Sequence, residues 1–139
     1  KNLFMEFTGI TRRAEKIEKK KIRRIKNNFK YLNKINSISK EAYQVLKKGN
    51  LDRIGTLLNE TWQIKKKLQG SVSNKIIDRI YNEGIKAGST GGKLLGAGAG
   101  GFILFYVKKK YKKKFLHKMS KYKIVKFKLQ NEGSKIINI

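Results

Sequence analysis

The residues best suited to chemistry form one glycine-dense segment, which has the sequence GSTGGKLLGAGAGGFILFYV from Gly88 to Val107. Four of its glycines, which have no side chain, allow another group to approach the backbone closely: Gly96, Gly98, Gly100 and Gly101. Glycine accepts positive φ, so successive N–H groups in such a segment can turn together towards an anion. The pattern therefore indicates phosphate binding by the backbone. Lys93, just ahead of these glycines, either contacts the same phosphate or ends a strand in solvent.

The order of elements around these glycines differs from that of two common nucleotide-binding motifs. A P-loop requires a strand, then the glycines, then a helix, with Gly-Lys-Ser/Thr closing the loop. The dinucleotide-binding fingerprint has the same strand, loop and helix order. Here the glycines precede residues 102–107, whose composition is typical of a buried strand. Spacing alone therefore also permits a tight hairpin between two packed strands, with no chemistry.

A few side chains outside this segment could contact an anionic substrate. Arg12 follows a predicted Thr-Gly turn, and its guanidinium could bind a phosphate through two hydrogen bonds or pair with a surface carboxylate. Thr8 could hydrogen-bond a substrate or cap the turn. Lys65 and Lys66 could reach a substrate phosphate or lie on a solvated helix face.

The remaining reactive side chains do not form a catalytic or metal-binding pattern. The chain has no cysteine, which excludes disulfides and thiolate metal ligands. His117 is the single histidine, and no other ligand type clusters near it in the sequence. Asp52 fits a helix start, and Asp78 fits a solvated or ion-paired helix face. We therefore assign no catalytic residue and no metal ligand to this chain.

The composition is strongly basic, with a formal net charge of +26 over 139 residues. The length suits a single domain covering residues 1–139. Such a charge attracts polyanions through counterion release, so at least weak, non-specific binding is expected. However, the lysines are spread over nearly every segment beside many asparagines and isoleucines, which share A/T-rich codons, so a biased genome also explains them. Arginine forks and aromatic stacking platforms, which nucleic-acid recognition uses, are sparse.

The chain carries no sequence signal for a membrane. No segment approaches the roughly 18–20 apolar residues of a membrane span, and the first residues lack the pattern of a signal peptide. We therefore predict no membrane association and a cytoplasmic location. The chain begins at Lys1 with a strand-like run, so we expect it to continue a structure that starts upstream.

Apolar residues at helical spacing predict several helices after an initial strand over residues 3–7. The predicted helices cover residues 11–36, 39–50, 51–68 and 73–88, end signals included, and the first of these can break near Asn27-Asn28. Ser39 and Ser73 are the expected N-caps of the second and fourth helices. Trp62 lies on the apolar stripe of the third helix and is expected in the core.

The second half of the chain adds strands to this helical half. Short strands are predicted at residues 93–95 and 102–107, on either side of the glycines. An amphipathic helix at 108–121 follows, with lysine stems covering the sheet edge. Alternation at 122–129 and a turn at 131–133 predict a hairpin with a last strand at 134–139. The fold class is therefore α+β, with a helix-rich N-terminal half and an antiparallel sheet packed against helices.

The order of these motifs resembles the C-terminal domain of the GHMP kinases, which include galactokinase, homoserine kinase, mevalonate kinase and phosphomevalonate kinase. KLLGAGAGGF at 93–102 is similar to the third signature of that family, K-L-(T/L)-G-A-G-G-G-G before a hydrophobic strand, and departs from it at Ala99. Further segments resemble the branch that contains heptose 7-phosphate kinases and fucose-kinase-like proteins: TGITR at 8–12, NETWQIKKKL at 59–68, SVSNKIIDRIYNEGIKAGSTGGKLLGAG at 71–98 and KIVKFKLQNEGSKII at 123–137. Asn59 lies near a position where that branch has histidine.

The resemblance implies a ferredoxin-like domain and ATP-dependent phosphoryl transfer to a sugar or sugar-phosphate hydroxyl. It implies a phosphate or ATP site made by Lys93, Gly96, Ala97, Gly98, Ala99, Gly100 and Gly101. It also implies that the sugar faces Thr8, Gly9 and Arg12. ATP and Mg²⁺ would be cofactors of the parent protein, with the base and metal ligands in an N-terminal lobe. The G-L-G-S-S run of that lobe is absent from this sequence, so we expect the chain alone to be inactive.

Two other functions stay open at this point. The charge also suits a basic module that binds nucleic acid or another polyanion without catalysis. The predicted elements also suit a ferredoxin-like regulatory domain that binds a small ligand between helix and sheet.

Overall fold

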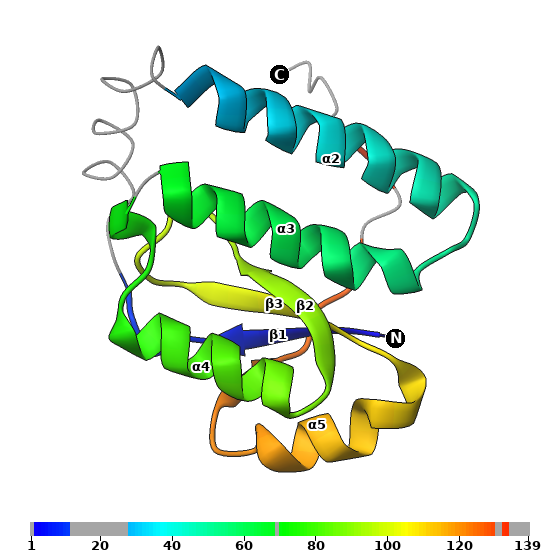
Figure 1. The fold of residues 1–139 in the computed structure, drawn as a ribbon. Coiled ribbons are helices and arrows are strands. Elements are labelled where there is room, and N and C mark those ends of the chain that lie inside the picture. Colours follow the sequence, from blue (N-terminus) through cyan, green and yellow to red (C-terminus); the bar gives the residue numbers. More distant parts are fainter. Residues whose placement is uncertain (1, 12–27, 69, 130–131, 134–139) are drawn as a thin grey trace, which may run out of the picture.

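The computed structural model describes residues 2–11, 28–68, 70–129 and 132–133, and it has the α+β architecture that the sequence predicts (Figure 1). Its elements follow in the order β1 (Leu3–Phe7), α2 (Phe29–Lys47), α3 (Asp52–Leu68), η2 (Gly70–Val72), α4 (Lys75–Lys86), β2 (Ser89–Leu94), β3 (Phe102–Val107), η3 (Lys109–Tyr111), α5 (Lys112–Lys118) and β4 (Lys123–Val125). No described helix is both long enough and apolar enough to cross a bilayer.

The described strands form an antiparallel sheet in the order β2-β3-β1-β4. With α4 between β1 and β2 and α5 between β3 and β4, this is the ferredoxin-like arrangement, into which α2 and α3 are inserted. The N-terminal strand β1 lies in the middle of the sheet and pairs with β3 from Leu3↔Tyr106 to Phe7↔Phe102. This register brings the end of β1 to the residue that follows the predicted glycine loop.

Strand alternation divides the side chains of the sheet between two faces. Phe4 and Glu6 of β1 are buried, whereas their neighbours are half-buried. α4 and α5 cover the face of Phe4, where the Phe115 ring lies 5.3 Å from Phe4 and 5.5 Å from Phe105. The opposite face carries Phe7, whose ring centroid lies 5.2 Å from that of Phe102. The sheet therefore has one face in the core and one face that begins the candidate site.

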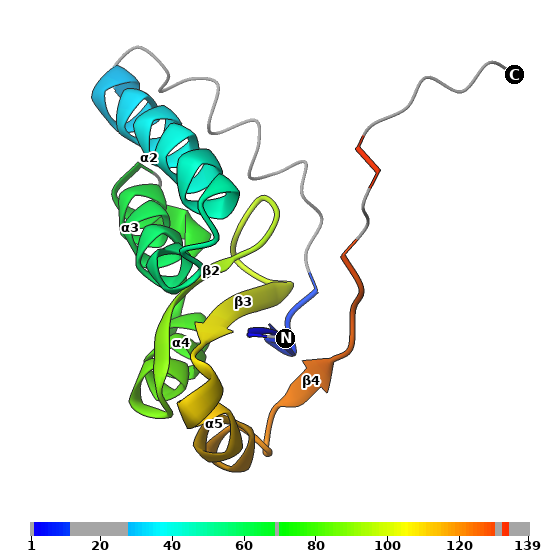
Figure 2. The ribbon, with the colours of Figure 1, turned by 90° about the vertical axis from the view of Figure 1, so that its right-hand side faces the viewer.

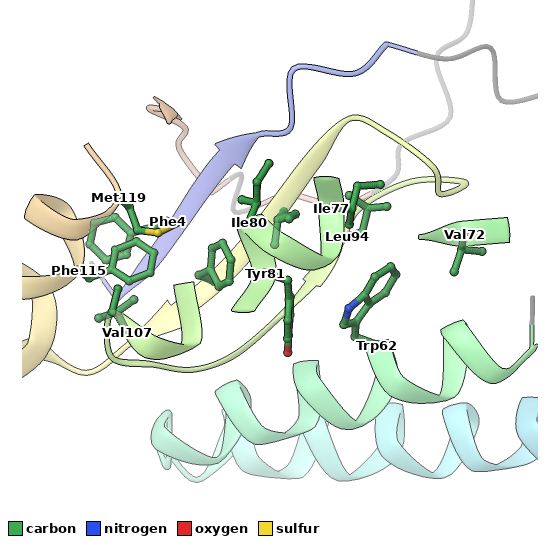
Figure 3. Close-up of a cluster of buried hydrophobic side chains, with 13 residues drawn as sticks. Phe4, Trp62, Val72, Ile77, Ile80, Tyr81, Leu94, Val107, Phe115 and Met119 are labelled. Atoms are coloured by element: carbon green, nitrogen blue, oxygen red, sulfur yellow. The ribbon is translucent and has the colours of Figure 1, made fainter. Parts of the chain in front are cut away.

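The core extends from this sheet to α3 (Figure 3). Trp62 is fully buried, as predicted, and its ring lies 6.2 Å from that of Tyr81 on α4. Tyr81 in turn lies 5.8 Å from Phe105 on β3. The buried cluster consists of Phe4, Trp62, Val72, Ile77, Ile80, Tyr81, Ala87, Leu94, Ile103, Phe105, Val107, Phe115 and Met119.

Helix α3 approaches β2 closely enough to require glycine on the strand. A Cβ atom added to Gly91 would lie 1.9 Å from the Gly55 carbonyl oxygen. Because side chains cannot intervene there, the backbones of helix and strand pack directly against each other. The close approach accounts for glycine at position 91, and β2 as a whole begins at Ser89, four residues before its predicted start.

The two predicted helices at 11–36 and 39–50 are wrong in their boundaries. Helix α2 runs without interruption through Ser39, whose hydroxyl donates to the Ile35 carbonyl oxygen at 3.0 Å instead of capping a helix. The apolar face that contains the buried Ile38 continues across this point, so packing outweighs the local N-cap preference of serine. The predicted positions 12–27 lie outside the described residues.

Three further boundaries also differ from the prediction. The N-cap of α4 is Asn74, whose side chain accepts the N–H groups of Ile76 and Ile77 at 3.0 Å each. Ser73 instead donates its hydroxyl to Asp78 at 2.8 Å. The helix predicted at 108–121 is shorter and begins with the 3-10 turn η3, and β4 covers three residues of the predicted 122–129. The predicted last strand at 134–139 lies outside the described residues.

Candidate functional site

The glycine loop, residues 96–101, joins β2 to β3 and is attached to the end of β1. The Leu95 N–H donates to the Phe102 carbonyl at 2.8 Å, which closes the loop at its base. The Gly101 carbonyl accepts both the N–H and the hydroxyl of Thr8, at 2.9 and 2.8 Å. The Gly101 N–H donates to Ile10 at 2.8 Å. The predicted Thr-Gly turn and the glycine loop, about 90 residues apart in the sequence, therefore form one unit.

The opposite side of the loop is attached to η2 and α3. The Ala99 N–H donates to the Val72 carbonyl at 2.7 Å, and the Lys65 ammonium donates to the Gly96 carbonyl at 2.5 Å. Gly98 has φ +114°, and a Cβ there would lie 2.9 Å from the Val72 Cβ. Glycine is required at this position because its φ is positive and because Val72 leaves no room for a Cβ atom.

Ala99 is the residue at which the loop departs from the family signature, and it has the conformation that glycine would adopt easily. Its φ is 60°, in the left-handed region, and its side chain is buried. A non-glycine residue in this region costs on the order of 1 kcal/mol. The loop therefore retains its shape at this alanine because the surrounding contacts impose it.

A pocket of about 800 Å³ lies against the loop and the exposed face of the sheet. Its lining consists of Phe7, Ile10, Thr11, Leu95, Gly96, Ala97, Gly98, Gly100, Gly101, Phe102, Lys123 and Val125. One wall is backbone, the floor is apolar, and Lys123 supplies a positive charge. The N–H groups of Gly96, Ala97 and Gly100 have no carbonyl acceptor among the described residues, so they are available to a ligand. Such a lining suits an anionic group attached to a less polar body.

Two predicted site residues lie beside the pocket without lining it. Lys93 is in β2, opposite Leu104, and burial lowers the pKa of its ammonium below the usual value. Thr8 is 5% exposed; besides donating to Gly101, its hydroxyl accepts the Ile10 N–H at 3.4 Å. The Thr8 hydroxyl thus holds the turn on the loop.

The other residues of the predicted sugar site are only partly placed. Gly9 is exposed with φ +74°, which suits the turn between β1 and Ile10. Arg12 lies outside the described residues. Its predicted contact with an anionic substrate therefore stays a prediction.

Glu6 is a buried carboxyl just behind this site. It is fully buried on the core face of β1, and neither of its oxygens has a hydrogen-bond partner among the described residues. Burial raises the pKa of Glu6 to about 7. Because successive strand residues point to opposite faces, Glu6 points away from the pocket that Phe7 lines.

The two acidic side chains considered above as candidates, Asp52 and Asp78, form ion pairs in the structure. Asp52, in the first turn of α3, pairs with Lys108 at 2.8 Å, and that hydrogen bond lowers the pKa of its carboxyl. Asp78 pairs with Lys66 at 3.7 Å. His117 is exposed near the end of α5. Within the described ranges, no group of three or more histidine, cysteine or carboxylate side chains could hold a metal.

Sequence reasoning missed the contacts that hold the loop. The sequence suggests only a solvated or substrate-binding role for Lys65, whereas in the structure its ammonium binds the carbonyl of Gly96. The signal that was present is its position three residues after the buried Trp62, which places both on neighbouring parts of one helix face. The acceptors at Val72 and Ile10 are backbone carbonyls, which no sequence pattern reveals.

Comparison with known proteins gives consistent results. The protein family described as GHMP kinases C terminal matches residues 42–124, more than half of the chain. A D-glycero-alpha-D-manno-heptose 7-phosphate kinase from Campylobacter jejuni is 36% identical over 104 residues, which make up 73% of this chain and 30% of that protein. A bifunctional fucokinase/GDP-fucose pyrophosphorylase from Arabidopsis thaliana is 30% identical over 118 residues, or 82% of this chain and 11% of that protein.

A solved structure extends the likeness to the fold. The crystal structure of L. major mevalonate kinase in complex with R-mevalonate superposes with a TM-score of 0.74 at 21% identity. The match covers 86% of this chain and 37% of the mevalonate kinase. The chain thus spans between 11% and 37% of the length of each of these proteins.

Proposed function

Because this chain belongs to the GHMP kinase family, we propose that it is the C-terminal domain of an ATP-dependent kinase that phosphorylates a sugar or sugar phosphate. A heptose 7-phosphate is the first candidate substrate, since the 36% identical relative is a kinase of that class. The observation that carries the proposal is the pocket in which the glycine loop meets the turn after β1. A phosphate site and a neighbouring acceptor site are the two things that a kinase must bring together.

The chain's own residues divide between these two sites. The N–H groups of the glycine loop that have no acceptor among the described residues bind phosphate oxygens, and Lys93 adds positive charge just ahead of the loop. Gly9 and Arg12 face the sugar, while Thr8 holds their turn against the glycine loop. The Arg12 guanidinium can bind a phosphate with two hydrogen bonds. Ala99 supports the loop from behind, since its N–H is already bound to Val72.

ATP and Mg²⁺ are the cofactors proposed for the parent protein. The pocket fits the phosphate portion of a nucleotide, since unbonded N–H groups line it. It does not fit a resident Mg²⁺, because no carboxylate is among its described lining residues and Mg²⁺ prefers carboxylate and water oxygens. The metal ligands and the base would come from an N-terminal lobe, which is the proposed partner of this domain. MgATP, when bound, supplies the phosphoryl group that is transferred.

The test is a phosphotransfer assay on a protein that joins this domain to its N-terminal lobe. We expect ATP- and Mg²⁺-dependent phosphorylation of a heptose 7-phosphate, tested beside other sugar phosphates, free sugars and mevalonate. The 139-residue chain alone should show no turnover. Turnover by the 139 residues alone would overturn the proposed division between lobes. A two-lobe protein that binds ATP but phosphorylates none of the sugars would overturn the substrate class.

The described structure gives no particular support to the other two functions. Several lysines are committed to ion pairs, such as Lys108 with Asp52 and Lys121 with Glu83. The relatives described above are kinases, not nucleic-acid-binding modules or regulatory domains. The cytoplasmic location stays a prediction from the sequence.

A further inference from the structure

Lys65 is a side chain of α3 that hydrogen-bonds to the glycine loop. It lies in the last turn of α3, and its ammonium crosses to the Gly96 carbonyl, 31 residues further along the chain. Trp62, one turn earlier, is fully buried between α3 and the core, so the part of the helix that carries Lys65 is firmly held. The lysine therefore extends from a rigid base to a loop rich in glycine.

The bond to Lys65 determines which way the next N–H group points. In a trans peptide the C=O of one residue and the N–H of the next point in opposite directions. No cis peptide occurs in the described part of the chain. A Gly96 carbonyl directed at α3 therefore directs the Ala97 N–H away from α3. Figure 2 shows the β2–β3 loop with α3 on one side and β1 and β4 on the other, and residues of β1 and β4 line the pocket.

The two halves of the loop are held in different ways. Residues 99–101 are fixed by backbone bonds to Val72, Ile10 and Thr8. The first half, Gly96 to Gly98, is attached to α3 through Lys65. Glycine on both sides of Ala97 makes rotation of the intervening peptides easy, so a bond is needed to select one orientation.

We propose that Lys65 is a positioning residue: by holding the Gly96 carbonyl, it turns the Ala97 N–H into the pocket as a donor to a phosphate oxygen. The ammonium also polarises the same peptide, since hydrogen bonds in a chain strengthen one another, and it adds positive charge behind the donor. This deepens the proposed function and rests on it for the identity of the anion, a nucleotide or sugar phosphate.

The experiment compares three single variants of the 139-residue chain by NMR, with inorganic pyrophosphate as the probe. Lys65→Met removes the ammonium and keeps a long apolar side chain, and Lys65→Arg restores a cation that can donate to Gly96. Lys67→Met is the matched control, because Lys67 is an exposed lysine of the same turn and its loss changes the net charge equally. The readouts are the Ala97 amide shift, the Gly96 carbonyl shift and the pyrophosphate affinity.

In the unmodified chain, pyrophosphate should shift the Ala97 amide. Lys65→Met should change the Gly96 carbonyl shift and weaken pyrophosphate binding about tenfold, the size of one charge-assisted hydrogen bond. Lys65→Arg should restore most of the affinity, and Lys67→Met should stay within about twofold of the unmodified chain, as expected for an exposed charge. An Ala97 amide that does not respond to millimolar pyrophosphate would overturn the proposal. Equal losses in Lys65→Met and Lys67→Met would also overturn it.

The same variants in the two-lobe protein separate this proposal from the kinase proposal. Lys65→Met should raise KM for ATP more than it lowers kcat, whereas Lys67→Met should change neither. If the NMR result holds and no sugar is phosphorylated, the kinase proposal fails and the role of Lys65 stands. If sugar is phosphorylated and the two variants behave alike, the role of Lys65 fails and the kinase proposal stands.

Discussion

Replacing Glu6 should remove a pH dependence of folding stability that its burial creates. The carboxyl is fully buried in the central strand β1, where Ile103 and Ile124 are its partners in the neighbouring strands. In the part of the chain that the structure describes, neither of its oxygens has a hydrogen-bond partner, so ionisation would leave an uncompensated charge. Burial therefore raises the pKa of Glu6 from its usual value of 4.5 to about 7.

The direction of this pH dependence follows from whether the folded or the unfolded protein holds the Glu6 proton. Between pH 4.5 and pH 7 the unfolded chain has lost the Glu6 proton while the folded protein still holds it. The free energy of unfolding therefore falls with rising pH in this window, by about 1.4 kcal/mol per pH unit. The total loss is about 3 kcal/mol, after which the curve levels off. Asp52 and Glu83 have lowered pKa values, so their contributions are lost only at more acidic pH.

The assay is urea unfolding of the 139-residue chain at half-unit steps from pH 4.5 to pH 8.5. The unmodified chain should lose about 3 kcal/mol across pH 4.5–7, whereas Glu6→Gln, which cannot ionise, should give a much flatter curve. At pH 8, Glu6→Leu should be more stable than the unmodified chain, since it also removes the unpartnered polar atoms. Glu83→Gln is the control: it removes an acid that accepts from Tyr122 and Lys121, and the slope between pH 5 and pH 7 should persist. A Glu6→Gln curve with the same slope as the unmodified chain would refute the reasoning.

Three further substitutions test the loop, the helix–strand contact and the helix cap. Gly98→Val should cost about 1–3 kcal/mol of stability, because Gly98 has φ +114° and its Cβ would contact Val72. It should also weaken nucleotide binding by the two-lobe protein. Normal stability together with normal nucleotide binding would count against the phosphate-loop assignment. Gly91→Ala should cost more than about 2 kcal/mol in chemical unfolding, because its Cβ would overlap the Gly55 carbonyl, whereas Gly70→Ala, in open space, should be nearly neutral. Asn74→Ala should lower stability by about 1 kcal/mol and Ser73→Ala by less; the reverse order would restore Ser73 as the cap of α4.

Much of the fold could be predicted because its signals are local. The apolar spacing on α3 predicted a helix with Trp62 inside, and the structure buries that side chain completely. The apolar run at 102–107 predicted β3 with the same boundaries. The errors occurred where two local signals competed. Serine at positions 39 and 73 favours an N-cap. However, the apolar face of α2 continues past Ser39, so the helix does not begin there, and Asn74 instead of Ser73 is the N-cap of α4.

The candidate site was only half predictable, for a physical reason. Glycines mark a close approach of the backbone, so the loop itself could be found from residue types. What approaches the loop could not, because the Val72 and Ile10 carbonyls carry no side-chain signal and Lys65 is one lysine among many. The burial of Glu6 was equally invisible, since its strand alternation fixes a face but not what covers that face.

The sequence by itself determined which residues could do chemistry and which segments form helices and strands, because glycine freedom, charge and hydrophobic spacing are properties of the chain. Only the tertiary structure decided where these residues meet. Pairing of β1 with β3 brings Thr8 to Gly101, and packing of α3 beside β2 brings Lys65 to Gly96. Contacts between segments so far apart in the chain depend on strand register and helix packing, which are settled by burying the shared core and not by any short stretch of residues.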